Sequence, residues 1–572
     1  MALPINCKYC GKVFLPSVRE LAAYKKMKAP IAAIPCGDCR KKRHALEAVP
    51  AATPTAALAK TAPNDTIKRA PAFVAPIGNI LKKVDFGNEA ADDVDPEELA
   101  TYFVEHSTFA SFTQPRKKFA VAHARKGVGK SALLQWTAYK VAQEDDAALI
   151  IKCRGADLVR SRFNLTSILA QPNDYIRDWM IRICAIVNRQ LATTLHLALT
   201  DDRITLVETA ELEGFKSRNF VGCLLDRFHG ILERGNPTKL PAKDEIELMK
   251  RVKNRRVWLF IDDLDATFQN TPAECIALGT FFSACRYLLQ DVKDLIIRVT
   301  MRTDVWALIR HDDEALDKVE QYVHEVLWHQ SDFLQLLALR IRTSMQSSGI
   351  PLPHVPRHVS SADAHERLLE TVFVPKMDWA DGMVDTYKVL YTLSYERPRW
   401  AIQLCKLAQE AAIRSRSEII MRDNIDEVWG EYGAKRIADL VAEHKHQCGE
   451  VEELLNAFRG ANRLMARDEL FKWINNRVSE HMRPTIEGVQ TRTPMEIARF
   501  LYRLGFIVAR SDEADGHYEH YRFDQMPDFL SSRTDDDFGL KWEIHPCYRE
   551  ALDIKKLDQS HRKRFSQLRE RR

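Results

Sequence analysis

Residues 120–131 combine the side chains and the spacing that a phosphate-binding turn needs. They read Ala-Val-Ala-His-Ala-Arg-Lys-Gly-Val-Gly-Lys-Ser, which predicts a buried strand, a turn with two glycines and the start of a helix. In such a turn, backbone N–H groups and a helix N-terminus bind phosphate oxygens, a Lys reaches the β and γ oxygens, and a hydroxyl ligates Mg²⁺. We therefore expect Lys130 to face the phosphates and Ser131 to ligate magnesium.

The whole turn is the candidate nucleotide-binding segment. We expect its contacts to come from Ala124, Arg125, Lys126, Gly127, Val128, Gly129, Lys130, Ser131 and Ala132. Ala124 stands where many such turns have their first glycine, a departure that the relaxed form of the motif allows. A glycine-containing turn before an ordinary helix is the alternative, and the acidic motif described next argues against it.

A second chemical signal is a pair of carboxylates directly after the apolar run Val257–Ile261. Short continuous apolar runs are typical of buried parallel strands. In phosphoryl-transfer enzymes an acid at the end of such a strand holds Mg²⁺, and a neighbouring acid can orient the attacking water. We assign the first role to Asp262 and the second to Asp263; a solvated turn after a core strand is the alternative.

A third expected strand, Leu295–Thr300, runs into Met301-Arg302-Thr303-Asp304. Arg302 should therefore lie at the same edge of the sheet and sense the γ-phosphate, although a structural role is the alternative for Arg302 taken alone. Together and in this order, the three strand ends predict an α/β fold whose parallel sheet carries a P-loop that binds a nucleotide and Mg²⁺.

These motifs resemble those of the STAND and AAA-like P-loop ATPases of bacteria. The resemblance rests on residues 124–131, the run Asp262-Asp-Leu-Asp265, residues 301–304 and Glu396-Arg-Pro-Arg399, and it extends over residues 97–415 or so. It implies ATP hydrolysis, a helical lid after the ATPase core, a winged helix after the lid, and Arg399 as the lid arginine that touches nucleotide.

The same resemblance implies a biological role by analogy. Many of the bacterial forms belong to anti-phage defence systems, so we expect a nucleotide-driven switch that forms homo-oligomers. No second catalytic motif is visible in the sequence, and a partner effector protein is therefore expected to do any destructive chemistry. Origin-recognition and transposition ATPases share the layout, which makes a DNA-binding regulator or loader the alternative function.

Four cysteines form a separate pattern near the N-terminus. Cys7-x-x-Cys10 and Cys36-x-x-Cys39 are two pairs whose thiolates can converge on one tetrahedral Zn²⁺. A disulfide pair is disfavoured in a reducing compartment, and iron–sulfur clusters use closer or additional cysteines. We expect a structural zinc that folds a small module, because four thiolates leave no open coordination position.

Composition places the chain among ordinary multidomain proteins. It has 572 residues, of which 45% are hydrophobic and 28% charged, and no apolar stretch approaches the ~18 residues of a membrane span. Charged residues interrupt the start before an apolar segment of signal-peptide length, so we expect a cytoplasmic protein that does not enter membranes.

The predicted order of domains follows from these motifs and from changes in composition. Residues 49–69 are rich in Ala, Pro and Thr, as flexible tethers are, and Asp95-Pro96 is a typical helix start. We expect a zinc ribbon over residues 1–48, a flexible linker over 49–85, the P-loop ATPase core over 86–342, the helical lid over 343–445, a winged helix over 446–554 and a basic tail over 555–572.

The winged-helix expectation rests on the order of elements. One amphipathic helix is predicted over residues 470–478, a second begins at Thr493-Pro494, and two strand-like runs, Phe506–Arg510 and Tyr518–Phe523, follow it. Arg499 and Arg503 share the expected exposed face of the second helix, where a DNA reader carries cations, although Glu496 lies there too. Protein docking or simple packing is the alternative role of this helix.

Both ends of the chain are basic, although the whole chain has a net charge of only +5. Residues 1–50 carry ten Lys or Arg against three acids, and residues 555–572 carry eight against two. Such ends are suited to phosphate backbones, which makes nucleic acid a candidate partner through the termini or the winged helix. Charged, solvated termini are the alternative.

Overall fold

The structure is a computed structural model that forms two compact units, residues 1–75 and 76–572. It describes residues 5–6, 13–14, 80–106, 109–146, 148–160, 171–194, 256–266, 268, 271–292, 294–312, 314–354, 360–379, 382–512, 518–531, 537 and 539–555. The two units are described separately.

In the first unit a short antiparallel pair is described, β1 (Ile5–Asn6) and β2 (Val13–Phe14). Ile5 pairs with Phe14 and Asn6 with Val13. The expected zinc ligands Cys7, Cys10, Cys36 and Cys39 lie outside the described residues. The first pair of cysteines falls in the sequence between the two strands, which is where a knuckle turn is expected.

The second unit is built on a five-stranded parallel sheet. Its spatial order is β4 (Leu149–Arg154), β5 (Val257–Asp262), β6 (Leu295–Met301), β3 (Phe119–His123) and β7 (Val323–Glu325). The three strands expected from the sequence are confirmed as β3, β5 and β6. Because β6 lies between β3 and β5, the residues after β6 lie between the turn after β3 and the acids that end β5.

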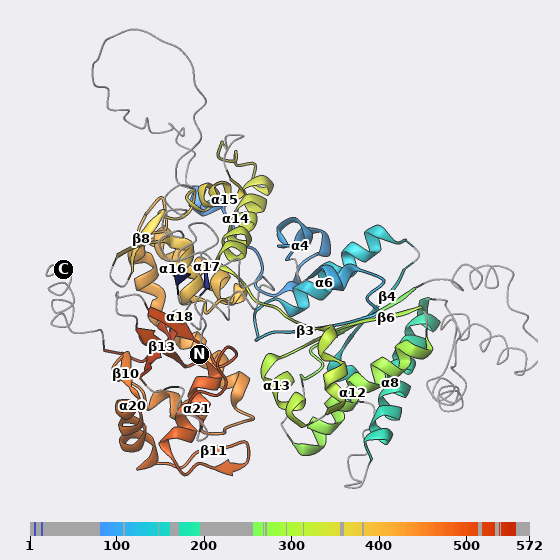
Figure 1. Ribbon diagram of the computed structural model, residues 1–572. Helices are drawn as coiled ribbons and strands as arrows, with labels where there is room; N and C mark the ends of the chain where they lie inside the picture. The colour runs from blue at the N-terminus through green and yellow to red at the C-terminus, as the bar shows by residue number, and fades with distance from the viewer. Residues whose placement is uncertain are drawn as a thin grey trace, which may run out of the picture. The chain divides into compact units, whose positions relative to one another are not determined.

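Helices cover both faces of this sheet (Figure 1). The helices α4 (Pro96–Tyr102) and α6 (Lys130–Glu144) pack on one face, and α8 (Pro172–Thr194), α12 (Pro272–Asp291) and α13 (Thr303–Asp312) on the other. Successive residues of β5 alternate between the faces, so Trp258 and Phe260 join the α6 side while Leu259 and Ile261 join the α12 side. Burial on both faces explains why this strand is apolar throughout.

Five shorter helices in the described residues complete this part of the fold. They are the 3-10 helices η2 (Ala91–Asp93), η4 (Glu314–Lys318) and η5 (Glu320–Tyr322), with α5 (Ala110–Thr113) and α7 (Gly155–Arg160). The expected start of α4 is confirmed, since the Asp95 side chain accepts a hydrogen bond from the Glu97 N–H and Pro96 is the first helical residue.

A helical region follows the sheet. Its helices are α14 (Gln330–Ser347), α15 (Ser361–Leu369), α16 (Thr386–Leu393), α17 (Pro398–Arg414) and α18 (Arg422–His444), with a hairpin of β8 (Lys376–Trp379) and β9 (Gly382–Asp385). The helix α14 buries Phe333, Leu336, Leu337 and Ile341, and the expected core–lid boundary at residue 343 falls inside it.

A four-stranded antiparallel sheet and more helices form the C-terminal region. The sheet has the order β10 (Leu464–Ala466), β15 (Lys541–Ile544), β13 (Ile507–Asp512) and β14 (Tyr518–Tyr521). The other elements are α19 (Val451–Asn456), α20 (Arg467–Ile474), the π-helix η6 (Asn475–Ser479), β11 (Thr485–Ile486), β12 (Val489–Gln490), α21 (Pro494–Leu504) and α22 (Pro546–Arg549).

The expected order of helix, helix and hairpin is present as α20, α21, β13 and β14. The sequence did not indicate β10 and β15. The strand β15 pairs with β10 on one side and with β13 on the other. Buried side chains of this region and of α14–α18 form one continuous hydrophobic cluster. The expected lid and winged helix therefore share a core.

The short helix α3 (Ile80–Lys83) belongs to the same cluster, because Leu81 and Val84 are buried in it. The flexible linker expected over residues 49–85 therefore overlaps a packed segment in its last six residues. The apolar residues of this segment belong to the same buried cluster as residues of α14 and α17. The composition of the Ala- and Pro-rich stretch before it did not indicate this packing. Among the described residues, no helix is long and apolar enough to cross a membrane.

Candidate nucleotide site

The turn between β3 and α6 has the backbone shape that its two glycines permit. Gly127 has φ +80° and Gly129 has φ +112°, in the left-handed region that side chains with a Cβ rarely adopt. Ala124 does not adopt a positive φ, which explains why alanine is acceptable at this position. The Ala124 N–H donates to the Met301 carbonyl at 3.2 Å and so ties the turn to the end of β6.

Lys130 is the first residue of α6 and points back into the turn. Its side chain is buried, and its Nζ donates to the Ala124 carbonyl oxygen at 3.2 Å. Ser131 and Ala132 follow in the first turn of the helix, whereas Lys126 is exposed. A buried ammonium beside free N–H groups of a helix N-terminus is a site of positive potential suited to phosphate oxygens.

The acids after β5 are held in place by Thr300, the penultimate residue of β6. The Thr300 hydroxyl donates to Asp262 Oδ1 and accepts a hydrogen bond from the Asp263 N–H at 3.1 Å. Asp262 Oδ1 also accepts from that N–H at 3.0 Å. The Asp262 carboxylate is therefore oriented by two donors before any ligand binds. Apart from the place of Thr300 at a strand end, nothing in the sequence indicates this role.

Asp263 has a strained backbone, with φ +47°. Burial of its carboxyl and the neighbouring charge of Asp262 raise the pKa of Asp263 above its ordinary value, and the Lys130 ammonium acts in the opposite direction. The three expected site residues Lys130, Asp262 and Asp263 are therefore close enough to influence one another.

Arg302, expected to sense the γ-phosphate, is bound by an acid of the same motif. Asp265 is only 2% exposed, and it accepts the Arg302 N–H at 3.3 Å and its Nε–H at 2.6 Å. Burial alone would lower the pKa of Arg302, but the charges of Asp304 and Asp265 outweigh burial and raise it. Asp265 thus fixes the guanidinium at the edge where Asp262 and Asp263 lie.

Arg399 lies directly over the turn. It is the second residue of α17, and its N–H donates to the Gly127 carbonyl at 3.2 Å. A Cβ placed on Gly127 would lie 3.4 Å from Arg399 Cβ. The structure thus brings the expected lid arginine to the turn, and no ion pair of its guanidinium is found among the described residues.

The corner before α17 joins the turn to the C-terminal region. Glu396 contacts Arg125 of the turn at 3.7 Å and also pairs with Arg522, which follows β14. Arg125 stacks over the Tyr395 ring at 4.5 Å, and both Tyr395 and Glu396 have positive φ. Such backbone strain at a contact point is typical of functional corners. Sequence reasoning singled out the Glu396–Arg399 motif but did not find this link.

Trp328, between β7 and α14, closes the other side of the turn. Its Nε1–H donates to the Val128 carbonyl at 2.8 Å, and its own carbonyl accepts from the Tyr391 hydroxyl at 2.8 Å. A small cavity opens here, lined by Ala124, Arg125, Val128, Thr303, Glu325, Val326, Leu327, Trp328 and Glu396. Three residues of the turn, Ala124, Arg125 and Val128, line this cavity.

The two arginines expected on the exposed face of α21 are occupied. Arg503 pairs with Glu487 at 2.7 Å, and Arg499 is half-buried with its guanidinium 5.9 Å from the centre of the Phe523 ring. Burial lowers the pKa of Arg499. The hairpin β11–β12 and the residues after β14 therefore cover part of the face on which both cations were expected.

The residues expected to bind magnesium fit the way in which P-loop proteins hold it. In the described part of the chain no three His, Cys, Asp or Glu side chains gather as a metal site. Mg²⁺ in nucleotide sites needs only one or two protein ligands, because phosphate oxygens and waters supply the rest. The oriented carboxylate of Asp262 and the hydroxyl of Ser131 meet that need.

One family model matches the chain. Residues 332–441 match the FunZ-associated C-terminal helical domain, which is about a fifth of the sequence. The match runs from the first turn of α14 to near the end of α18, so it coincides with the helical region that contacts the turn. No curated protein matches the sequence.

Three solved structures are similar to this chain at 12% identity. The ORC2 protein of Aeropyrum pernix in ADPNP and ADP complexes has a TM-score of 0.36, with 80% of this chain and 91% of that chain covered. Cdc6p from Pyrobaculum aerophilum has 0.29, with 80% and 96% covered. The ORC1 protein of Aeropyrum pernix in complex with DNA has 0.30, with 81% and 93% covered. These low TM-scores do not establish a common arrangement of the whole chains.

Proposed function

We propose that this protein binds and hydrolyses ATP at the turn between β3 and α6. The observation that carries the proposal is the buried Lys130 ammonium, which lies against the Ala124 carbonyl beside the ends of β5 and β6. A buried, unpaired ammonium is costly unless an anion joins it. The triphosphate of a nucleotide supplies that anion, and the helix N-terminus of α6 adds N–H donors.

Each site residue has a role in this proposal. Ser131 and Asp262 would hold Mg²⁺, which neutralises charge on the β- and γ-phosphates. Asp263 orients the attacking water, while Arg302 and Arg399 contact the γ-phosphate from the end of β6 and from α17. The Asp265 carboxylate supports this assignment of Arg302, because it fixes the guanidinium at the strand end.

The corner at Glu396 supports a switch in which nucleotide binding alters the C-terminal region. Arg125 belongs to the turn that would wrap the phosphates, and Glu396 shares its carboxylate between Arg125 and Arg522. A triphosphate competes with Glu396 for Arg125, so its binding would change the charge balance at Arg522. That change would in turn alter contacts within a homo-oligomer and with a partner effector protein, as in the defence ATPases that the motifs resemble.

Phosphate release tests the proposed activity. The purified protein should release phosphate from ATP with Mg²⁺ and stop when the metal is chelated, and Ser131→Ala should lower turnover at limiting Mg²⁺. Hydrogen exchange tests the switch: ATP should lower exchange in β14, because Glu396 released from Arg125 then pairs with Arg522 alone, and Glu396→Gln should remove that response. The surface pair Arg414–Glu427 offers a control, because Glu427→Gln should keep the response.

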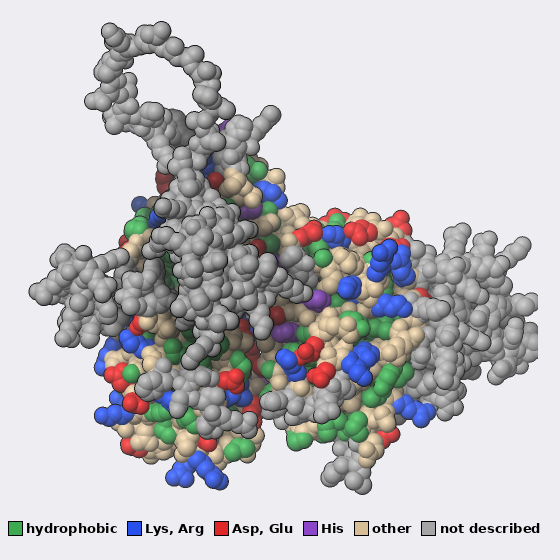
Figure 2. All heavy atoms as spheres, in the orientation of Figure 1, with side chains coloured by type: hydrophobic (Ala, Val, Ile, Leu, Met, Phe, Trp, Pro, Cys, Tyr) green, Lys and Arg blue, Asp and Glu red, His purple; other side chains and the backbone are tan. Residues whose placement is uncertain are grey.

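DNA binding by a regulator or loader is the second candidate function, and it now rests on the basic termini. In the view of Figure 2, Lys and Arg side chains are interspersed with Asp and Glu on the described surface. Arg499 and Arg503 are occupied by intramolecular contacts. A salt titration of DNA binding, with and without removal of residues 556–572, tests this role: steep salt dependence that is lost with the tail supports it.

We also propose that the four N-terminal cysteines bind one structural Zn²⁺. The antiparallel pair β1–β2 supports this, since its strands flank Cys7 and Cys10 in the sequence as the arms of a knuckle do. The zinc would fold a small module without a role in the chemistry of the nucleotide site.

A further inference from the structure

Arg154, the last residue of β4, lies beside the expected magnesium ligand. In the parallel register of β4 and β5, Arg154 is paired with Asp262. Paired residues of neighbouring strands point to the same face of a sheet, here the face that carries α6. We propose that Arg154 contacts the γ-phosphoryl group of ATP bound to the same chain and stabilises its charge during transfer. This inference rests on the proposed ATPase function.

The end of β4 packs closely against the backbone of the acid motif. Gly155 follows Arg154, and a Cβ placed on it would lie 2.3 Å from Leu264 Cα and 2.5 Å from the Asp263 carbonyl oxygen. No side chain fits between these segments, so the position requires glycine. The Arg154 N–H donates to Asp157 Oδ2 at 3.3 Å and starts α7. The backbone of Arg154 is therefore fixed relative to Asp262 and Asp263.

The guanidinium of Arg154 is available to a ligand. Its side chain is exposed, and within the described residues no hydrogen bond or ion pair engages it. Other arginines around the site are engaged: Arg302 by Asp265, Arg125 by Glu396, and Arg397 by the buried Glu443 at 3.2 Å. Among the residues that the structure describes, the guanidinium groups of Arg154 and Arg399 flank the turn and the acids without such a partner.

The charge of Arg154 acts on the carboxyl group of Asp92 in η2. Burial raises the pKa of Asp92 and the charge of Asp262 raises it further, whereas Arg154 and Arg399 lower it. Asp92 therefore lies within electrostatic range of Asp262 and of both free arginines. The acids and the two cations therefore lie within electrostatic range of Asp92 at the carboxyl end of the sheet, the end at which a γ-phosphate held by Lys130 would be bound.

The chemistry of ATP hydrolysis explains why a cation at the position of Arg154 would help the reaction. The oxygen of a water molecule bonds to the γ-phosphorus while the bond from that phosphorus to the β,γ-bridging oxygen breaks. ADP leaves with the electron pair, inorganic phosphate forms, and the proton of the water passes to the Asp263 carboxylate and then to solvent. Charge spreads over the γ oxygens in the transition state, and a guanidinium donating to them lowers the barrier without exchanging a proton.

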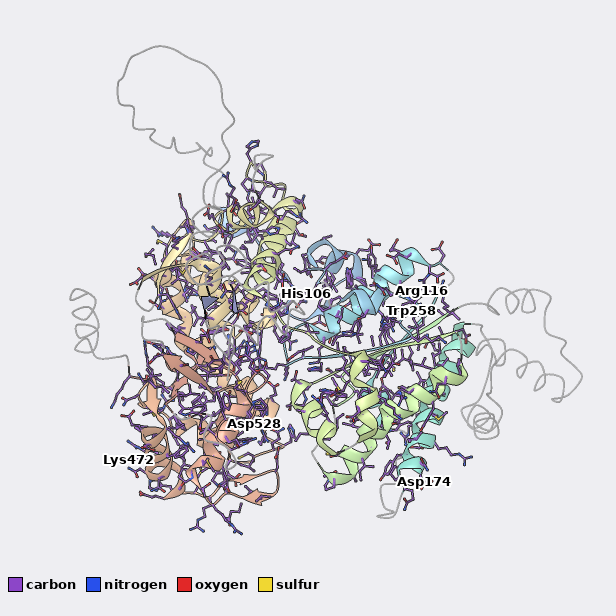
Figure 3. The ribbon with its side chains drawn as sticks, viewed as in Figure 1. His106, Arg116, Asp174, Trp258, Lys472 and Asp528 are labelled. Carbon is purple, nitrogen blue, oxygen red and sulfur yellow. The ribbon has the colours of Figure 1, made fainter. Side chains whose placement is uncertain are left out.

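Turnover and ADP affinity of Arg154→Ala test the inference. We expect kcat to fall at least on the order of 10²-fold, since arginines that act on transferring phosphates contribute this much or more. The dissociation constant for ADP should stay within about twofold, because ADP has no γ-phosphate. Arg154→Lys should recover part of the loss, since it keeps the charge but not the planar fork. The exposed Arg116, before β3 and labelled in Figure 3, gives the control Arg116→Ala, which should match the parent.

Three results would overturn the inference while the parent enzyme still hydrolyses ATP. The first is a kcat of Arg154→Ala equal to that of the parent. The second is an equal loss of ADP affinity and turnover, which would indicate a structural role; Arg154→Gln is measured if the alanine variant unfolds at a lower temperature. The third is restored turnover on mixing Arg154→Ala chains with Lys130→Ala chains, which would place Arg154 at a neighbouring chain's nucleotide. A parent protein that releases no phosphate would instead refute the proposed function.

Discussion

Asp265 holds Arg302 through both carboxylate oxygens, one on the backbone N–H at 3.3 Å and the other on Nε at 2.6 Å. The third acid of the Asp262–Asp265 motif is therefore a positioning residue. Its carboxylate is buried, and a buried charge is tolerated because the guanidinium compensates it. In the proposed site, the first two acids of the motif are then available for magnesium and for water.

Because Asp265 positions Arg302, substitutions of these two residues should have non-additive effects on turnover. Asp265→Asn should lower kcat because the released Arg302 no longer points at the γ-phosphate, and Arg302→Ala should lower it by a similar factor. The double variant should be no worse than either single one, since both remove the same interaction. A double-mutant cycle on kcat measures this, and losses that multiply would show that the two residues act independently.

Asp262 and Asp263 should have different phenotypes although they are neighbours. Asp263→Asn should keep ATP bound while slowing turnover roughly 10²–10⁴-fold, the contribution of a positioned general base. Asp262→Asn should instead weaken the Mg²⁺-dependent part of ATP binding. Calorimetric titrations with and without Mg²⁺, combined with rates of phosphate release, distinguish them. If Asp263→Asn hydrolyses ATP at the parent rate, another acid orients the water.

His123 should make the folded state sensitive to acid. Burial lowers the pKa of His123 from 6.5 to about 4, and its Nδ1 lies 3.2 Å from the Thr303 hydroxyl. Between pH 6.5 and about 4 the unfolded chain therefore binds more protons than the folded one, so the free energy of unfolding falls as the pH falls through this window. His123→Gln should show a shallower slope in denaturant unfolding, and the exposed His481→Gln the parent's slope. Equal slopes for all three would refute the assignment.

Zinc analysis tests the N-terminal module. Freshly purified protein should contain about one Zn²⁺ per chain, and Cys36→Ser should release it. ATP binding should be unchanged in this variant, because the Ala- and Pro-rich residues 49–69 separate the cysteines from the ATPase core. Cys153→Ser, on β4, should keep the metal. An iron chromophore, or protein without metal, would contradict the four-thiolate site.

The sequence predicted those parts of the fold in which local pattern and chemistry coincide. The strands β3, β5 and β6 were recognisable because each is an apolar run that ends in residues with a chemical role. The hairpin β13–β14 and the helix α21 followed from spacing and from the Thr493 cap. The turn itself was predictable because glycine at positions with positive φ is a local requirement.

Contacts between distant segments were not predictable in the same way. Thr300 forms a hydrogen bond to Asp262, which is 38 residues away in the sequence, and Glu396 pairs with Arg522, which is 126 residues away. No periodicity or motif links residues at such separations. The strands β10 and β15 have three and four residues, too few for a pattern to emerge. Arg499 and Arg503 were placed on an exposed face because helical spacing gives the face of a residue but not the segments that cover it.

Calorimetric titration of Lys130→Ala with ATP and Mg²⁺ tests the proposed function most directly. Lys117 is exposed and lies before β3, outside the turn, so Lys117→Ala is a control for the loss of one positive charge. We predict that Lys130→Ala loses measurable ATP binding because the buried ammonium faces the β- and γ-phosphates, while Lys117→Ala binds as the parent does. Unchanged ATP affinity in Lys130→Ala would contradict the assignment of this turn as the nucleotide site.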